Sequence, residues 1–185
     1  MTFIAGFIEK DNIFLFSDTA VTDWESNKEV QSSSFGETTY SDEERIVYQS
    51  EIKLFTENND RLIIGGSGTS KSIDSFIENI ETYSNYGLSC NRIIESALDN
   101  IEDNDFEILL GYFDNDIPVL YKKSTNSIEL ENCSNDISCI GVEGKHFNLF
   151  KRNFNELKSQ TSNFESWNPK KISVAVNSIL QAYGT

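Results

Sequence analysis

The second residue of the chain is the first candidate for chemistry, because it becomes the N-terminus if the initiator methionine is removed. Thr2 directly follows Met1, and methionine is commonly removed before a small residue. A mature N-terminal threonine carries a hydroxyl nucleophile and a free α-amine, and that amine can accept the hydroxyl proton. Because α-amino groups titrate at about 7.7–8.0, such an amine is suited to general-base work near neutral pH.

The second candidate is a glycine-rich turn between an expected strand and an expected helix. Residues 61–74 have the sequence RLIIGGSGTSKSID. A phosphate-binding loop, G-x-x-x-x-G-K-[ST], would use Lys71 and Ser72, but Ser70 stands where that motif requires a glycine. Hairpins surround this turn, whereas phosphate loops belong to sheets of βαβ units. The turn can instead direct backbone N–H groups at a developing oxyanion, or simply let the chain bend into a helix.

Composition limits the classes of function. The 185 residues include 30 acids and 15 bases, for a formal charge of −15. This excess of acid argues against binding to nucleic acid or to an acidic membrane surface. Three cysteines and one histidine form neither a zinc pattern nor a disulfide framework, and we expect no cofactor. The sequence has no signal-peptide pattern and no apolar run of about 20 residues, so we expect a cytoplasmic protein of one domain, spanning 1–185.

The elements that must position these candidates follow from the periodicity of the sequence. Strand formers bounded by turn signals predict strands at 2–9, 13–18, 45–56, 61–66, 106–113, 117–123, 127–133 and 137–142. Apolar residues at steps of three and four predict a helix between the glycine turn and residue 85, and others within 90–102 and 144–158. A last helix is expected to begin with Asn168 as its N-cap and Pro169 as its first residue, and to stop at Gly184.

The expected elements run in the order strands, two helices, strands, two helices. Strands joined by hairpin turns indicate antiparallel sheets, and segregated helices indicate layers that cover outer faces. Two stacked sheets between two helix layers would accommodate this order. The polar, acidic stretch 22–44 is expected to be an exposed insertion, which could serve as a lid, an assembly contact or a disordered loop.

Four segments occur in the order found in proteasome β-subunits and the related bacterial peptidase HslV. They are TFIAGFIEKDNIFLFSDTAVT, EIKLF, RLIIGGSGTSKSID, and FEILLGYFDNDIPVLYKK followed by CIGVEG. The chain therefore resembles the N-terminal-nucleophile (Ntn) hydrolases of that group over most of residues 2–183. The resemblance implies an α+β, four-layer αββα sandwich of two antiparallel sheets between helix layers. It also implies that the family's closing C-terminal strands are missing here.

The resemblance further implies a catalytic cluster of Thr2, Asp18, Lys53 and Gly68. In such a cluster Thr2 attacks the carbonyl, Asp18 orients Lys53, and the Lys53 ammonium disfavours protonation of the neighbouring α-amine. The N–H of Gly68, with Ser67 beside it, would stabilise the oxyanion. The implied function is a proteasome-like threonine hydrolase that cleaves peptide or amide bonds. Its implied partners are a peptide or protein substrate, further copies of the chain in a homo-oligomer such as a ring, and an unfoldase.

Several positions depart from the family pattern and keep a second hypothesis open. Ala20 stands where an arginine usually follows the aspartate, and Val142 stands where a serine usually lies near the nucleophile. The acidic insertion lengthens the segment between Asp18 and Lys53. Relatives also continue beyond the position of Thr185 into strands that add an aspartate and a serine to the site. These departures support a second hypothesis, that the chain is a catalytically inactive, proteasome-like structural or regulatory subunit.

Overall fold

Four layers of secondary structure form the body of this computed structural model, which describes residues 3–17, 20–23, 40–42, 45–49, 54–57, 61–101, 105–127, 129–141, 145–160 and 168–181. The strands are β1 (Ile4–Glu9), β2 (Asn12–Ser17), β3 (Ala20–Asp23), β4 (Tyr40–Asp42), β5 (Arg45–Gln49), β6 (Leu54–Glu57), β7 (Leu62–Gly68), β8 (Phe106–Asp114), β9 (Ile117–Lys123), β10 (Leu130–Asn132) and β11 (Ser138–Ile140). The helices are α1 (Ser70–Ser84), α2 (Cys90–Asp99), α3 (Lys145–Gln160) and α4 (Pro169–Gln181).

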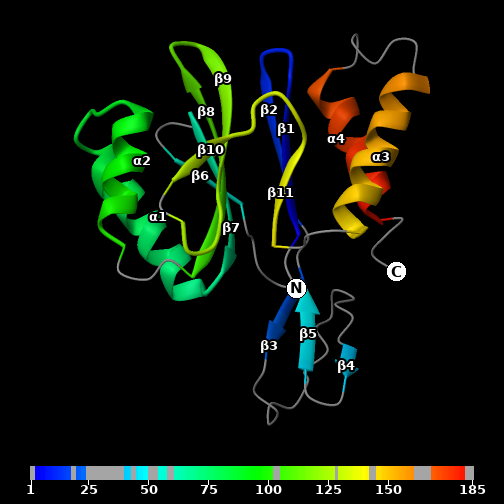
Figure 1. The fold of residues 1–185 in the computed structure, drawn as a ribbon, viewed down its shortest axis with the longest axis horizontal. Helices are drawn as coiled ribbons and strands as arrows, with labels where there is room; N and C mark the ends of the chain where they lie inside the picture. The colour runs from blue at the N-terminus through cyan, green and yellow to red at the C-terminus, as the bar shows by residue number, and fades with distance from the viewer. Residues whose placement is uncertain are drawn as a thin grey trace.

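Two antiparallel sheets form the middle of the fold. One has the strand order β11-β1-β2 and the other the order β10-β9-β8-β7-β6. Helices α1 and α2 cover the outer face of the five-stranded sheet, and α3 and α4 cover the outer face of the three-stranded sheet (Figure 1). The α+β, αββα arrangement expected from the sequence is therefore confirmed.

Alternation along the strands divides the apolar residues between the layers. Ile4 and Leu15 face the second sheet and belong to a buried cluster between the two sheets. Their neighbours Phe7 and Phe14 face the opposite way, against α3 and α4, where the Phe7 ring lies 4.5 Å from the ring of Phe154. Because successive side chains of a strand point to opposite faces, β1 and β2 contribute to two cores at once. This explains why the N-terminal hairpin is apolar on both faces.

The helix layers are fixed by packing, capping and ion pairs. Phe76 and Ile80 of α1 are fully buried against the five-stranded sheet, as their spacing predicted. Asn168 caps α4 as expected, since its Oδ1 accepts a hydrogen bond from the N–H of Lys171 at 3.0 Å. On α3, Lys158 pairs with Glu9 of β1. The Lys158–Glu9 pair thus links the α3–α4 layer to β1.

A second ion pair joins α3 to the segment before β11. The Lys151 ammonium donates a hydrogen bond to the Asp136 carboxylate and lowers the pKa of that carboxyl below its usual range. The Asp136 side chain also accepts a hydrogen bond from the N–H of Ile137 at 2.8 Å, immediately before β11 begins. The position of β11 beside β1 is thus supported from the helix layer as well as by strand pairing.

A third, small sheet was not expected from the sequence. Strands β3, β5 and β4 form it in that order, and it extends from the end of the sandwich at which β1 begins (Figure 1). The strand character of 45–56 is divided between β5 and β6, which belong to different sheets. Residues 22, 23 and 40–42 of the expected insertion are strand, while 24–39, 43 and 44 lie outside the described residues. The single domain and the role of the insertion stay predictions.

Within the described ranges, no helix has the length and apolar character needed to cross a membrane.

Candidate active site

The start of β1 is the point at which several strand ends meet. Ile4, the first residue of β1, pairs with Ser17 at the end of β2 and with Ile140 at the end of β11. Ile4 also packs across the sandwich on Gly65 of β7, where an added Cβ would lie 2.7 Å from Cγ2 of Ile4 and 3.3 Å from Cδ2 of Leu54. The close approach of the two sheets at this point requires a glycine at position 65.

Three of the four expected site residues lie outside the described residues, but their chain neighbours converge on this point. Thr2 comes two residues before Ile4, Asp18 directly follows Ser17, and Lys53 directly precedes Leu54. The structure therefore brings together the segments that carry these three residues, without describing the residues themselves.

Gly68, the fourth expected residue, ends β7 just before α1. It pairs with Phe106 of β8 and has a φ of +120°. An added Cβ would lie 2.8 Å from the carbonyl oxygen of Asp105 and 2.8 Å from Cα of Phe106. Only glycine suits this backbone conformation and this space. The predicted strand, glycine turn and helix are therefore present, and steric constraints alone require glycine at position 68.

The geometry around the glycine turn does not fit a phosphate-binding loop. Strand β7 pairs antiparallel with both β6 and β8, whereas a phosphate loop follows a strand of a parallel βαβ sheet. Ser72, which would have to reach a bound metal, is 4% exposed and belongs to the buried face of α1. The structure thus favours the turn as a steric or oxyanion element over a nucleotide site.

Glu107 is a site candidate that sequence reasoning missed. Glu107 of β8 pairs directly with Ser67 of β7, and their side chains share the face that carries Gly65, which points toward the other sheet. The Glu107 Oε2 accepts a hydrogen bond of 2.7 Å from the N–H of Gly141, the residue after β11. The available signal was a lone acid in the apolar strand FEILLGYF.

Lys123 is a buried charge that sequence reasoning also missed. Its side chain is fully buried on the helix side of the five-stranded sheet. The Nζ donates a hydrogen bond to the Phe106 carbonyl oxygen at 2.9 Å and lies 3.9 Å from the centre of the Phe106 ring. Because Phe106 pairs with Gly68, Lys123 supports the end of the β7–β8 strand pair at which the glycine turn begins.

Replacing Lys123 with alanine is expected to destabilise the protein by about 2–4 kcal/mol, because the change creates a cavity and removes a buried hydrogen bond. Equilibrium unfolding in urea measures this loss. Lys122→Ala is the matched control, because Lys122 directly precedes Lys123 in β9 but is only half-buried. A loss of about 1 kcal/mol or less is expected for the control. Equal losses in the two variants would contradict a special role for Lys123.

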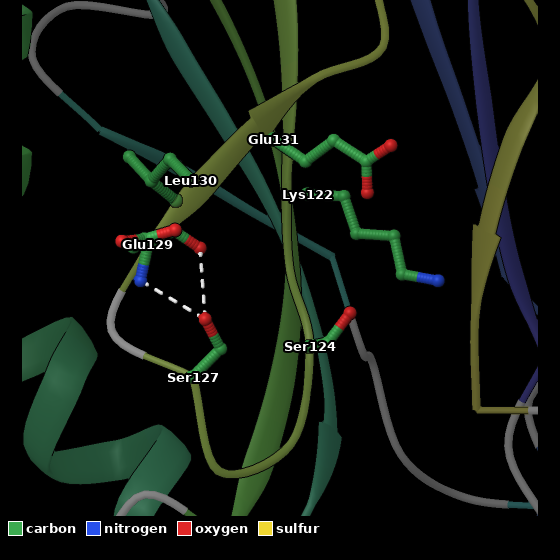
Figure 2. A pocket seen from close by; sticks show the side chains of 6 residues that line it. All are labelled: Lys122, Ser124, Ser127, Glu129, Leu130 and Glu131. Atoms are coloured by element: carbon green, nitrogen blue, oxygen red, sulfur yellow. Dashed lines mark hydrogen bonds between the residues drawn. The ribbon is translucent and has the colours of Figure 1, made fainter.

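A polar hollow at the β9–β10 turn lies apart from these strand ends. Figure 2 shows the residues that line it, which are Lys122, Ser124, Ser127, Glu129, Leu130 and Glu131. The Ser127 hydroxyl accepts a hydrogen bond of 3.1 Å from the Glu129 N–H and lies 3.4 Å from the Glu129 carbonyl oxygen. This hydroxyl is therefore engaged by its own turn, and the described residues that line the hollow include no histidine or cysteine. Among the described residues, no cluster of three or more metal-ligating side chains occurs.

Comparison with known proteins finds similarity in fold but not in sequence. At the level of sequence it matches no protein-family model and has no significant match among curated proteins. Its structure is similar to eukaryotic HslV from Trypanosoma brucei, with a TM-score of 0.59 and 16% identity over 96% of this chain and 88% of that one. It is also similar to an Anbu mutant from Hyphomicrobium sp. strain MC1, with a TM-score of 0.56 and 11% identity over 82% of this chain and 64% of that one. The chain therefore has an HslV-like fold.

Proposed function

We propose that this chain is a proteasome-like threonine hydrolase that cleaves peptide or amide bonds with Thr2 as its nucleophile. One observation carries the proposal. The segments next to Thr2, Asp18 and Lys53 meet at the start of β1, where Ile4 pairs with Ser17 and lies with Leu54 against Gly65. The HslV-like fold supports the same assignment, and so does the order of the sequence motifs.

In the proposed reaction, Thr2 Oγ attacks the substrate carbonyl and its own α-amine accepts the hydroxyl proton. The Lys53 ammonium keeps that amine available as a base, and Asp18 orients and neutralises Lys53. The N–H of Gly68 stabilises the oxyanion of the tetrahedral intermediate. The amine then returns its proton to the leaving amine, and a water molecule activated by the same amine hydrolyses the acyl-enzyme.

The same resemblance supports assembly of the chain into a homo-oligomer in the cytoplasm, with an unfoldase as a possible delivery partner.

The alternative, an inactive proteasome-like subunit, is favoured by Ala20 and Val142, which replace an arginine and a serine of the family pattern. The two functions make opposite predictions for the reactivity of the N-terminus, so one experiment separates them.

The test is the mass of the purified, mature protein before and after incubation with a peptide epoxyketone. The proposed function requires loss of Met1 and a single adduct that fragmentation mapping locates on Thr2. A chain that retains Met1 has no free threonine amine, and that result would refute the proposal. A processed chain that takes up no epoxyketone would instead favour the inactive subunit.

A further inference from the structure

The two halves of the proposed site belong to different sheets. Thr2 precedes β1 of the three-stranded sheet, whereas Gly68 ends β7 of the five-stranded sheet. The nucleophile and the oxyanion donor can act together only if the two sheets keep a fixed separation at this end of the sandwich. Misplacement of reacting groups by about 1 Å costs on the order of 100-fold in rate. A contact that spans the sheets at this end is therefore of functional interest.

Glu107 makes such a contact. Its strand, β8, pairs with β7 so that Glu107 lies opposite Ser67, the residue before Gly68. Its carboxylate reaches across to the N–H of Gly141 at 2.7 Å. Gly141 directly follows Ile140, which pairs with Ile4 at the start of β1. One side chain thus links the strand pair that carries the glycine turn to the strand pair that begins at the N-terminus.

The chemistry of this link favours a defined geometry. A side-chain oxygen that accepts from a backbone N–H forms a directional contact, because a hydrogen bond weakens steeply as its angle departs from linear. Gly141 has a φ of +87°, a conformation that turns the chain as it leaves β11. Apolar contacts between the sheets, such as Ile4 on Gly65, resist separation, but they are non-directional and set no orientation. The hydrogen bond of Glu107 adds that orientation.

We propose that Glu107 is a positioning residue that joins the two sheets at the proposed site, through its hydrogen bond to Gly141, and so sets the distance between the nucleophile and the oxyanion donor. This role rests on the proposed function. It requires a hydrogen-bond acceptor at position 107 and does not require proton transfer by the carboxylate.

The test compares Glu107→Ala and Glu107→Gln with the wild type, using the rate of covalent labelling by a peptide epoxyketone. We expect Glu107→Ala to lower the maximal labelling rate by about 10- to 100-fold, while the reagent concentration for half-maximal rate changes little. Glutamine keeps an acceptor oxygen on a side chain of equal length, so Glu107→Gln should recover most of the rate. Glu131→Ala, which removes an exposed carboxylate of β10 in the same sheet, should label like the wild type.

Hydrogen exchange at the Gly141 amide tests the contact without any need for activity. We expect faster exchange at Gly141 in Glu107→Ala and wild-type exchange in Glu107→Gln. Unchanged exchange in the alanine variant, or unchanged labelling, would overturn the inference while the proposed function stands. Labelling that is lost equally in the glutamine variant would also overturn it, because the charge would then be needed. If the wild type takes up no reagent, the proposed function fails and the positioning role fails with it, whatever the exchange at Gly141 shows.

Discussion

Replacing Thr2 with alanine is expected to reduce peptide or amide hydrolysis by a factor on the order of 10⁴, because the attacking oxygen is lost. Alanine is also small, so removal of Met1 should proceed as in the wild type. The variant therefore keeps a free α-amine and differs from the wild type only in the side-chain hydroxyl and methyl group. The remaining activity would come from substrate binding and the oxyanion donor alone.

The matched control for this prediction is Thr2→Ser, which keeps both the hydroxyl and the α-amine. Its activity should stay within about 100-fold of the wild type, far above that of the alanine variant. Hydrolysis of a panel of fluorogenic peptides measures the three proteins, and intact mass verifies that each has lost Met1. Activity that survives in Thr2→Ala would show that a different residue is the nucleophile.

Local patterns in the sequence were sufficient to predict most of the fold. β1 and β2 are short apolar runs of strand formers separated by a turn signal, and the apolar residues of α1 recur at steps of three and four, so each element could be placed from its own residues. Asn168 could be recognised as a cap because capping depends on residues within one turn of the helix. These features are encoded over short distances along the chain.

The parts of the fold that were missed depend on contacts between distant segments. The stretch 45–56 has strand character throughout, and nothing within it indicates that β5 and β6 join different sheets. Likewise, Glu107 bonds to a backbone N–H that is 34 residues away. A backbone donor has no residue type, so no sequence pattern could mark Gly141 as the partner. Lys123 was missed for the same reason, since it binds the backbone carbonyl of Phe106.

The candidate site was predictable to a different extent for each residue. The turn that contains Gly68 was predicted from the order strand, glycine-rich segment and helix, whereas Gly68 itself was singled out by the resemblance. The structure supplies a steric reason for its glycine. Whether its N–H serves as the oxyanion donor stays a prediction. The roles of Thr2, Asp18 and Lys53 also stay predictions, and they came from the resemblance of whole motifs. Their spacing alone could not group them, because a site built from strand ends gathers residues that are far apart in the chain.

Replacing Gly68 with alanine is expected to impair both folding stability and activity. A φ of +120° lies in a region that L-residues rarely adopt, and the strain costs about 1–3 kcal/mol. The added Cβ would also meet the Asp105 oxygen and the Phe106 Cα at 2.8 Å. Both are backbone atoms of β8 and its preceding residue, so relief requires a shift of the β7 and β8 backbones relative to each other. Displacement of the Gly68 N–H should then lower the catalytic rate by about 10²- to 10³-fold, the usual cost of losing one oxyanion donor.

Gly87→Ala is the control that separates backbone strain from the collision at Gly68. Gly87 also has a positive φ, of +68°, but an added Cβ there would meet nothing within 4 Å. Its conformation is close to the left-handed helical region, so alanine should cost only about 1–2 kcal/mol and leave hydrolysis unchanged. Urea unfolding and peptide hydrolysis measure both variants. A contrary result would be a Gly68→Ala variant that is no less stable than Gly87→Ala and hydrolyses peptides at the wild-type rate. In that case the end of β7 tolerates a side chain at position 68, and Gly68 is not the oxyanion donor. A loss of stability with hydrolysis unchanged would leave the steric account intact and would still remove Gly68 from the mechanism.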